Sequence, residues 1–230
     1  ATSEEMNEQK NSSENMNEIN TTVNQCLLKN EVIVDGKPFT KKQSTIENPK
    51  WVLHDSIGYF FPGDKKVNLK AAVQKGNMQR IYGLGKDTVY AEKVFSLWLN
   101  HGVQPHDENY EYTIIPGIET AEIINYSKNP AVWTLLNTKQ IQAVYHKNLQ
   151  VFGLVFHEKG EFNYEDITVK VNSACLLLMD EKNRTISISE PTAKAESVKV
   201  KITKKDTYQF EKEFVLPRAG FAGKTVSEKF

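Results

Sequence analysis

The sequence is short of three things: cysteine, an excess of charge of one sign, and long apolar runs. Its 29 Lys and Arg residues balance 29 Asp and Glu residues, so the chain as a whole has no field that would attract nucleic acid or an anionic membrane. A polyanion would have to be held by a local patch. No run approaches the roughly 20 apolar residues that a membrane-spanning helix requires. These absences argue against a nucleic-acid partner and against a membrane span.

Two cysteines, Cys26 and Cys175, are too few for a disulfide framework or a zinc site. Each stands in an apolar run, where cysteine behaves as a small hydrophobic residue. Two readings stay open, namely two buried free thiols or a single Cys26–Cys175 disulfide. The redox compartment is therefore undetermined.

The beginning of the chain is polar. It starts at Ala1 with neither an initiator Met nor a signal peptide, from which we expect a processed or excised segment. Residues 1–20 hold five glutamates, and their only large apolar side chains are Met6, Met16 and Ile19. These are too few to offset the entropy lost on ordering. We predict a flexible polar arm or loop over residues 1–20.

Strand patterning dominates the rest of the sequence. The stretch Lys93–Gly117 predicts two long strands folded about a polar loop at 102–109, a hairpin that ends at Pro116-Gly117. Its first arm is apolar on both faces, which predicts that both are covered. Further strands are expected at Thr21–Leu28, at Trp51–Phe61 as one long strand, at residues 67–73, at Arg80–Leu84 as a short strand, and at Glu119–Asn125. A turn is expected at Gly76-Asn77, between the strands at residues 67–73 and Arg80–Leu84.

A boundary is expected near residue 130, in the SKNP segment. After it, short strands with one wet and one dry face follow each other, clearest in Thr185–Ser189 and Val198–Ile202, which is a sandwich pattern. A further strand is expected within residues 210–217, followed by a loose tail. We predict an all-β protein with three parts: the arm at 1–20, part of a large antiparallel β-sandwich at 21–130, and a small C-terminal β-sandwich at 131–230.

Several side chains invite a chemical role. No HxH or HExxH spacing supports a metal site, so His54 and His101 read first as structural histidines within strands. Gly83–Lys86 is a hairpin turn rather than a phosphate loop, because Asp87 stands where a hydroxyl is needed. Core packing is favoured for the tryptophans. The alternative is sugar binding by an exposed ring or basic side chain, and its candidates are His54, Trp98 and His101. The other two tryptophans of the chain are Trp51 and Trp133.

Four motifs carry a family resemblance. HGVQPHDENYEYTIIPG, KWVLHDSIGYFF, TTVNQCLL and the later pair QIQAVYHKNLQVFGLVF with SISEPT resemble, in this order, segments of polysaccharide lyase family 8. The resemblance implies a central β-supersandwich, similar to galactose mutarotase, followed by a small β-sandwich. It also implies secretion or a periplasmic location in a bacterium. Asp55-Ser56-Ile57 resembles an O-glycosylation sequon, which makes Ser56 a glycosylation candidate.

Enzymes of this family cleave chondroitin sulfate and hyaluronan by β-elimination. The resemblance places their base, their acid and their carboxylate-neutralising groups on a helical toroid and early in the central β-domain, and none of those motifs occurs here. No catalytic residue is therefore carried over, and this chain alone is expected to be inactive. It would complete the central sandwich and support the cleft, with the toroid portion as partner on the same or a separate chain. The sequence requires no cofactor and no metal, although the full enzyme has room for calcium.

Two other classes of protein remain open. The chain could be a free-standing carbohydrate-binding or adhesion module, or a structural interaction domain without sugar contact. A stand-alone domain should not present an uncovered apolar edge such as the strand VNQCLL, which favours the lyase portion.

Overall fold

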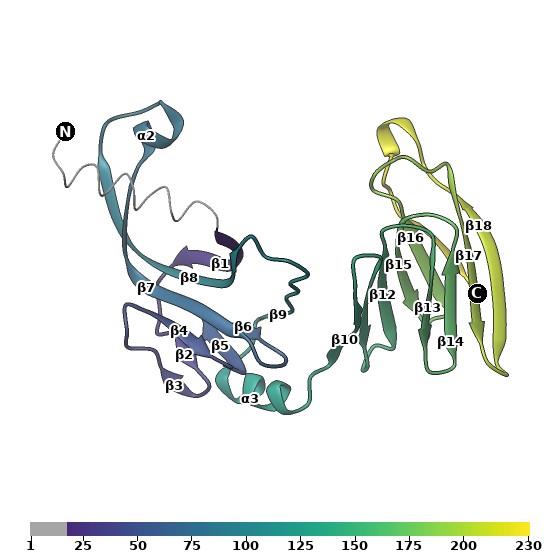
Figure 1. The fold of residues 1–230 in the computed structure, drawn as a ribbon, viewed down its shortest axis with the longest axis horizontal. Coiled ribbons are helices and arrows are strands. Elements are labelled where there is room, and N and C mark those ends of the chain that lie inside the picture. The colour runs from purple at the N-terminus through teal and green to yellow at the C-terminus, as the bar shows by residue number, and fades with distance from the viewer. Residues whose placement is uncertain (1–17) are drawn as a thin grey trace. The chain divides into compact units, whose positions relative to one another are not determined.

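A computed structural model describes residues 18–230, and nearly all of its regular structure is β-strand, which confirms the all-β prediction (Figure 1). The chain divides into two compact units between Asn129 and Pro130. Most of the predicted arm lies outside the described residues. Its last three residues, Glu18 to Asn20, begin the first strand instead, because their backbone pairs with the neighbouring strand as far as Val103.

Two antiparallel sheets form the first unit. The outer sheet has the order β1-β8-β7-β4, and the inner sheet has the order β3-β2-β5-β6-β9. The outer strands are β1 (Glu18–Leu27), β8 (Val89–Val103), β7 (Lys66–Asn77) and β4 (Gln43–Glu47). The inner strands are β3 (Lys37–Pro38), β2 (Ile33–Val34), β5 (Trp51–His54), β6 (Ile57–Phe60) and β9 (Thr113–Pro116).

The inner sheet is covered on both faces, and β5 shows how. Val52 belongs to the core shared with the outer sheet, while Trp51 and Leu53 pack with Ile123 of helix α3 (Thr120–Lys128). Successive strand side chains alternate between faces, so the apolar run of β5 fits a strand between two layers. The outer sheet contributes Phe95, Leu97 and Leu99 to the core.

The predicted hairpin at Lys93–Gly117 is wrong. β8 pairs with β1 and β7, whereas β9 pairs with β6 in the inner sheet, so the two arms belong to different layers. The predicted cover on both faces is also wrong for β8: Phe95 is fully buried, but Ser96 and Trp98 on the other face remain half-exposed. Alternation shows which residues share a face, but it does not show which strand lies beside them.

The predicted single strand Trp51–Phe61 is interrupted. β5 and β6 form a tight hairpin, because Asp55 and Ser56 adopt positive φ values of 50° and 56°. Two such residues in succession give the turn whose twist matches that of the flanking strands. Both residues therefore stand at a turn, and His54 is the last residue of β5.

Two predicted strands are helices. α2 (Met78–Tyr82) replaces the strand expected at Arg80–Leu84, and the expected turn at Gly76-Asn77 is the end of β7, where the Asn77 side chain accepts a hydrogen bond from the Arg80 amide. α3 replaces the strand expected at Glu119–Asn125. A capping box made by Glu119 and Glu122 satisfies free amides at its start.

The second unit is a β-sandwich of two antiparallel sheets. One has the order β10-β11-β12-β15-β16-β19 and the other the order β13-β14-β17-β18. The first sheet contains β10 (Val132–Asn137), β11 (Ile141–His146), β12 (Val151–Phe156), β15 (Cys175–Asp180), β16 (Thr185–Ser189) and β19 (Val226–Lys229). The second contains β13 (Gly160–Tyr164), β14 (Ile167–Val171), β17 (Ser197–Lys204) and β18 (Tyr208–Val215).

The alternation predicted for this unit corresponds to its core, since Val198, Val200 and Ile202 of β17 are fully buried. The expected loose tail is wrong in part. A 3₁₀ turn (Ala219–Phe221) leads into β19, an edge strand paired with β16. Core packing is also wrong for Trp133, which is 49% exposed.

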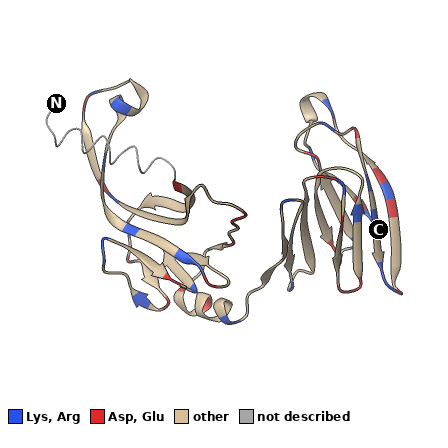
Figure 2. Cartoon of the chain, viewed as in Figure 1, with Lys and Arg blue, Asp and Glu red and all other residues tan. Residues whose placement is uncertain are grey.

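Charges of opposite sign face each other on the second unit, where β17 carries lysines and the neighbouring β18 carries Glu211 and Glu213 (Figure 2). Glu211 lies 2.9 Å from the ammonium group of Lys199 and 3.5 Å from that of Lys201. Such cross-strand pairs neutralise each other locally. They offer little free positive charge to a polyanion.

Candidate functional site

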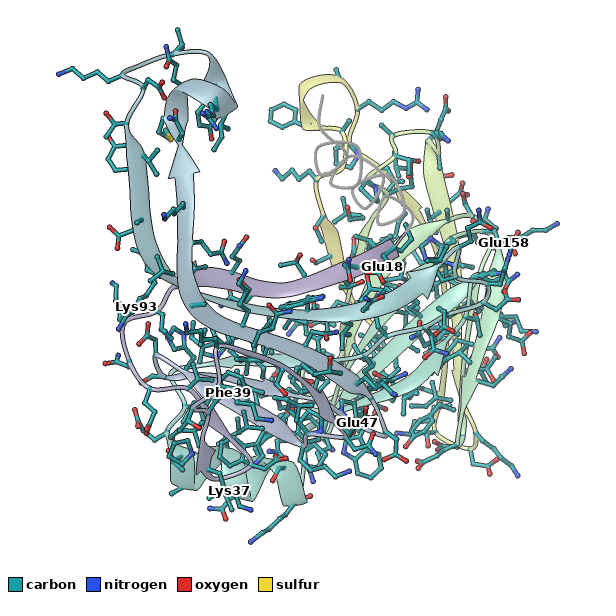
Figure 3. All side chains as sticks on the ribbon, turned by 60° about the vertical axis from the view of Figure 1, so that its left-hand side comes forward. Glu18, Lys37, Phe39, Glu47, Lys93 and Glu158 are labelled. Atoms are coloured by element: carbon teal, nitrogen blue, oxygen red, sulfur yellow. The ribbon has the colours of Figure 1, made fainter. Side chains whose placement is uncertain are left out.

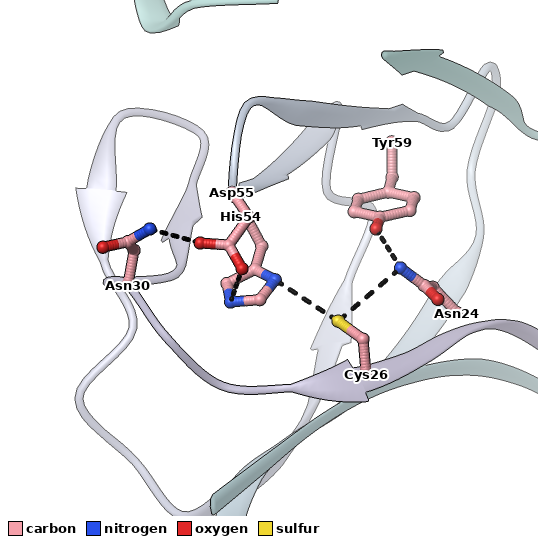
Figure 4. A network of polar contacts seen from close by, with 6 residues as sticks. All are labelled: Asn24, Cys26, Asn30, His54, Asp55 and Tyr59. Atoms are coloured by element: carbon pink, nitrogen blue, oxygen red, sulfur yellow. Dashed lines mark hydrogen bonds and ion pairs between the residues drawn. The ribbon is translucent and has the colours of Figure 1, made fainter. Parts of the chain in front are cut away.

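A polar network lies between β1 and the β5–β6 hairpin in the first unit (Figure 4). The Cys26 thiol is 3.7 Å from Nδ1 of His54, and Nε2 of His54 is 3.5 Å from a carboxylate oxygen of Asp55. On one side of this chain of contacts, the Asn24 amide donates a hydrogen bond to the buried Tyr59 hydroxyl. On the other side, the amide of Asn30 donates to Asp55.

The order Cys26, His54, Asp55 is that of a nucleophile, a base and an orienting carboxylate. The electrostatics oppose such a role. Burial raises the pKa of the Cys26 thiol, and the nearby Asp55 charge raises it further, whereas an activated cysteine needs a depressed pKa. Burial also lowers the pKa of His54, and Asp55 offsets this only in part. The network is therefore built from a protonated thiol and a neutral imidazole.

His54 itself is 1% exposed, and its Nε2 makes no hydrogen bond within the described part of the chain. The expectation that His54 is a fully satisfied structural histidine is thus wrong for one of its two nitrogens. Its ring does not offer a surface to a polysaccharide chain.

Both cysteines are free thiols, so the Cys26–Cys175 disulfide is wrong. Cys175 is buried, and burial raises its pKa to about 12. Cys26 is only half-buried.

Trp98 lies on the open face of the outer sheet, opposite the core. It stands between Thr22 of β1 and Asn68 of β7 in the sheet register. A hollow of about 250 Å³ opens beside it, and its lining is mostly amide and hydroxyl side chains. The lining residues are Asn20, Thr22, Gln25, Ser96, Leu97 and Trp98. A half-exposed indole among amides and hydroxyls is a surface on which a sugar ring can stack and form hydrogen bonds.

His101 lies at the far end of β8, and its Nε2 is 2.8 Å from the Thr21 hydroxyl. Its ring contacts Tyr110 with centroids 5.5 Å apart, and Tyr110 in turn stacks on Tyr112 at 6.2 Å. Tyr110 is 48% exposed. The sequence analysis assigned both tyrosines to a strand. They precede β9, and the Tyr-x-Tyr pattern was the signal that could have marked them as a surface cluster.

Ser56 is exposed at the β5–β6 turn, where its hydroxyl donates to Glu119 at 3.0 Å. It borders an open depression of about 500 Å³ that is also lined by Lys29, Asn30 and Asp55. Glycosylation of Ser56 remains a prediction, with the hydroxyl in a turn rather than in a strand.

Among residues 18–230, no three His, Cys, Asp or Glu side chains converge in a way that could hold a metal ion. Within the same residues, no helix has the length and apolarity that crossing a membrane demands.

Comparison with known proteins defines the class. Residues 6–127 match the super-sandwich domain of polysaccharide lyase family 8, and residues 134–199 match the C-terminal β-sandwich domain of the same family. The chain belongs to polysaccharide lyase family 8, which confirms the resemblance carried by its motifs.

Three curated relatives show which lyases the chain is similar to. Chondroitinase-AC of Pedobacter heparinus is 33% identical over 217 residues, which cover 92% of this chain and 31% of that protein. Hyaluronate lyase HylB of Enterococcus faecalis is 27% identical over 150 residues, covering 65% and 15% respectively. Xanthan lyase of a Bacillus species is 26% identical over 140 residues, covering 59% and 15%. The chain thus spans less than a third of each of these relatives.

Solved structures of lyases also superpose on this chain. A chondroitinase AC lyase studied in complex with oligosaccharides superposes with a TM-score of 0.85 at 31% identity, over 93% of this chain and 33% of the other. Paenibacillus xanthan lyase superposes with a TM-score of 0.78 at 20% identity, over 90% of this chain and 23% of the other. The latter likeness is one of fold alone.

Proposed function

We propose that this chain is the carboxyl-terminal β-portion of a glycosaminoglycan lyase, which cleaves chondroitin sulfate or hyaluronan by β-elimination. The observation that carries the proposal is the match to Chondroitinase-AC across 92% of this chain. In this role the portion completes the central sandwich and supports the cleft. Its partner is the toroid portion, on the same or a separate chain, and the enzyme is secreted or periplasmic.

The chain by itself has no turnover in this proposal. β-Elimination needs a base for the proton next to the uronate carboxylate, a group that neutralises that carboxylate, and an acid for the leaving oxygen. The imidazole of His54 is buried, and the thiol of Cys26 has a raised pKa. Their state supports the placement of the reacting groups on other polypeptide.

Substrate contact is assigned to the hollow beside Trp98 and to the His101–Tyr110 pair. Both are built from rings, amides and hydroxyls rather than from Lys or Arg side chains, so they would hold the neutral parts of the polysaccharide. Neutralisation of sulfate or uronate would come from the partner portion.

The test compares this chain with the longer lyase polypeptide that contains it. Each is incubated with chondroitin sulfate and hyaluronan, and the ultraviolet absorbance of unsaturated uronate is followed. We expect a rise with the longer polypeptide and none with this chain. Turnover by this chain alone, or none by either, would contradict the proposal.

Site residues are tested in the longer polypeptide. Trp98→Ala should raise KM several-fold, because a stacking surface is lost, and should leave kcat largely intact. Trp133→Ala is the matched control, since Trp133 is 49% exposed in the other unit. Equal KM values for the two variants would remove Trp98 from the site.

A second candidate is a free-standing carbohydrate-binding module, which is favoured by the hollow beside Trp98. Titration of this chain with chondroitin oligosaccharides separates the two. Tight binding by the chain alone, lost in Trp98→Ala, would support the module, whereas weak or absent binding supports the lyase portion.

A further inference from the structure

The long hairpin β7–α2–β8 extends beyond the sheet that carries it (Figures 1 and 3). On one side, pairing with β1 ends at Leu27 opposite Val94. On the other side, pairing with β4 ends at Gln43 opposite Lys70. The carbonyl of Lys93 still accepts a hydrogen bond from the Leu28 amide. Beyond it, among residues 18–230, the two strands pair only with each other, from Gln74 opposite Glu92 to Asn77 opposite Val89. A two-stranded ribbon of this kind is marginally stable by itself in water.

The end of the ribbon, residues 78–90, is called the hairpin tip below. It has a defined local structure. The Asn77 side chain accepts a hydrogen bond from the Arg80 amide and donates one to Asp87, which ties both sides of the tip together. Gly83 ends α2 in the left-handed region with φ 69°, a conformation that glycine adopts without strain. Asn77 is 7% exposed, so the Asn77 end of each bond is shielded from water. The tip is thus pre-shaped.

The surface of this pre-shaped tip is apolar. Every residue from Met78 to Lys93 is exposed in the structure. Six large apolar or aromatic side chains of the tip are between 49% and 75% exposed: Met78, Ile81, Tyr82, Leu84, Val89 and Tyr90. Contiguous exposed apolar surface of this kind marks an interaction site in soluble proteins.

The composition of the tip points to a protein partner. Interface centres are enriched in aromatic residues, Met and Arg and depleted in Lys, Glu and Asp. The tip carries Met78, Arg80 and two tyrosines, and its other charges are only Lys86 and Asp87. With Asp87 held by Asn77, the partner surface should be apolar, with few charges at its centre.

We propose that the hairpin tip docks into an apolar recess on the part of the lyase polypeptide that lies outside this chain. The inference rests on the proposed function. The hairpin belongs to the region that matches the super-sandwich domain, and the chain accounts for only 31% of the matched Chondroitinase-AC. Related enzymes therefore have further polypeptide that can cover the tip. Docking would bury the apolar side chains and give the two-stranded ribbon a packing partner that residues 18–230 do not supply.

The first test is oxidative footprinting of Met78, Tyr82 and Tyr90. Their labelling rates are measured in this chain and in the longer lyase polypeptide, with the exposed Phe221 of the second unit as internal reference. We expect several-fold slower labelling of all three in the longer polypeptide. Equal rates would overturn the proposal. Protection that appears in this chain alone and grows with its concentration would also overturn it, because a second copy would then be the occupant.

The second test is the double variant Ile81→Ser/Leu84→Ser, with Val215→Ser as control because Val215 is 78% exposed in the second unit. In this chain, neither should shift the thermal midpoint. In the longer polypeptide, only the tip variant should lower it, and its tip should label as fast as in this chain. An unchanged midpoint and unchanged protection would refute docking. Uronate elimination by the unsubstituted longer polypeptide is read separately, so failure of the proposed function is distinguished from failure of docking.

Discussion

His54 and Phe95 stack across the two layers of the first unit, with ring centroids 4.6 Å apart and planes inclined by 23°. His54 comes from the inner sheet and Phe95 from the outer sheet, so the contact joins the two layers. An imidazole in such a place is held neutral by burial. His54 stands where a catalytic base would stand in the order Cys26, His54, Asp55. In this structure it is a packing residue, and its buried Nε2 makes no hydrogen bond within residues 18–230.

The first prediction concerns pH. Because burial lowers the pKa of His54 in the folded state, the unfolded chain binds its proton first as pH falls. The stabilising contribution is therefore complete above the unfolded pKa of about 6.5 and is lost as pH falls towards the lower folded pKa, at up to about 1.4 kcal/mol per pH unit. Denaturant unfolding at pH values from about 8 down to about 5 measures this loss of stability.

His54→Phe is the control for that experiment, since it keeps a ring beside Phe95 and removes the proton. Its stability should depend less on pH than that of the unsubstituted chain. The Cys26 thiol beside the ring and the Tyr59 hydroxyl of the same polar network both have raised pKa values, which leaves them neutral over this range. Identical pH profiles for the two proteins would show that His54 does not titrate as described.

The second prediction concerns Gly58. A Cβ atom at this position would come within 2.6 Å of Ile123, which is part of α3, and within 2.8 Å of Ile118, which precedes α3. Both side chains are buried. Gly58→Ala should lower the free energy of unfolding by about 1–3 kcal/mol, because α3 must move away from the inner sheet. Gly76→Ala is the control, since nothing lies within 4 Å of a Cβ there. Equal stability of the two variants would contradict the close packing of α3.

The third prediction concerns Glu190, a carboxylate that is 4% exposed. Burial favours its neutral form, but hydrogen bonds from Thr192, Ala195 and Lys194 outweigh burial and lower its pKa. Glu190→Gln should cost about 2 kcal/mol of stability, because an amide replaces an acceptor that gathers several donors.

The sign of the Glu190 effect with pH follows from the lowered pKa. Its contribution is present above the unfolded value of 4.5 and is lost as pH falls towards the folded value. Urea unfolding at neutral pH and near pH 4 measures both effects. Glu158→Gln, at an exposed position (Figure 3), should change neither.

The fourth prediction concerns the thiols. Cys26 is half-buried and should react slowly with a thiol reagent in the native state, faster at alkaline pH because its pKa is raised. Cys175, with a pKa of about 12, should react only after unfolding. Cys26→Ser should remove the native-state reaction alone. If unfolded, unreduced protein showed no free thiol, the two cysteines would be bridged.

The sequence was sufficient for the class of fold and for much of the second unit. Strict alternation in β17 predicted its core, because a sheet with one wet face repeats every two residues. It was less informative for the helices. α2 and α3 span five and nine residues, so each contains too few repeats of an apolar period to distinguish a helix from a strand.

The sequence by itself determined that this is an all-β chain, that it belongs with the family-8 lyases, and which residues are apolar. Only the tertiary structure decided that β8 and β9 lie in different layers, that His54 is enclosed while Trp98 remains open, and that the hairpin tip has no cover in residues 18–230. The physical reason is that side-chain periodicity is a local property of the chain. Strand pairing and burial depend on neighbours that are distant in sequence.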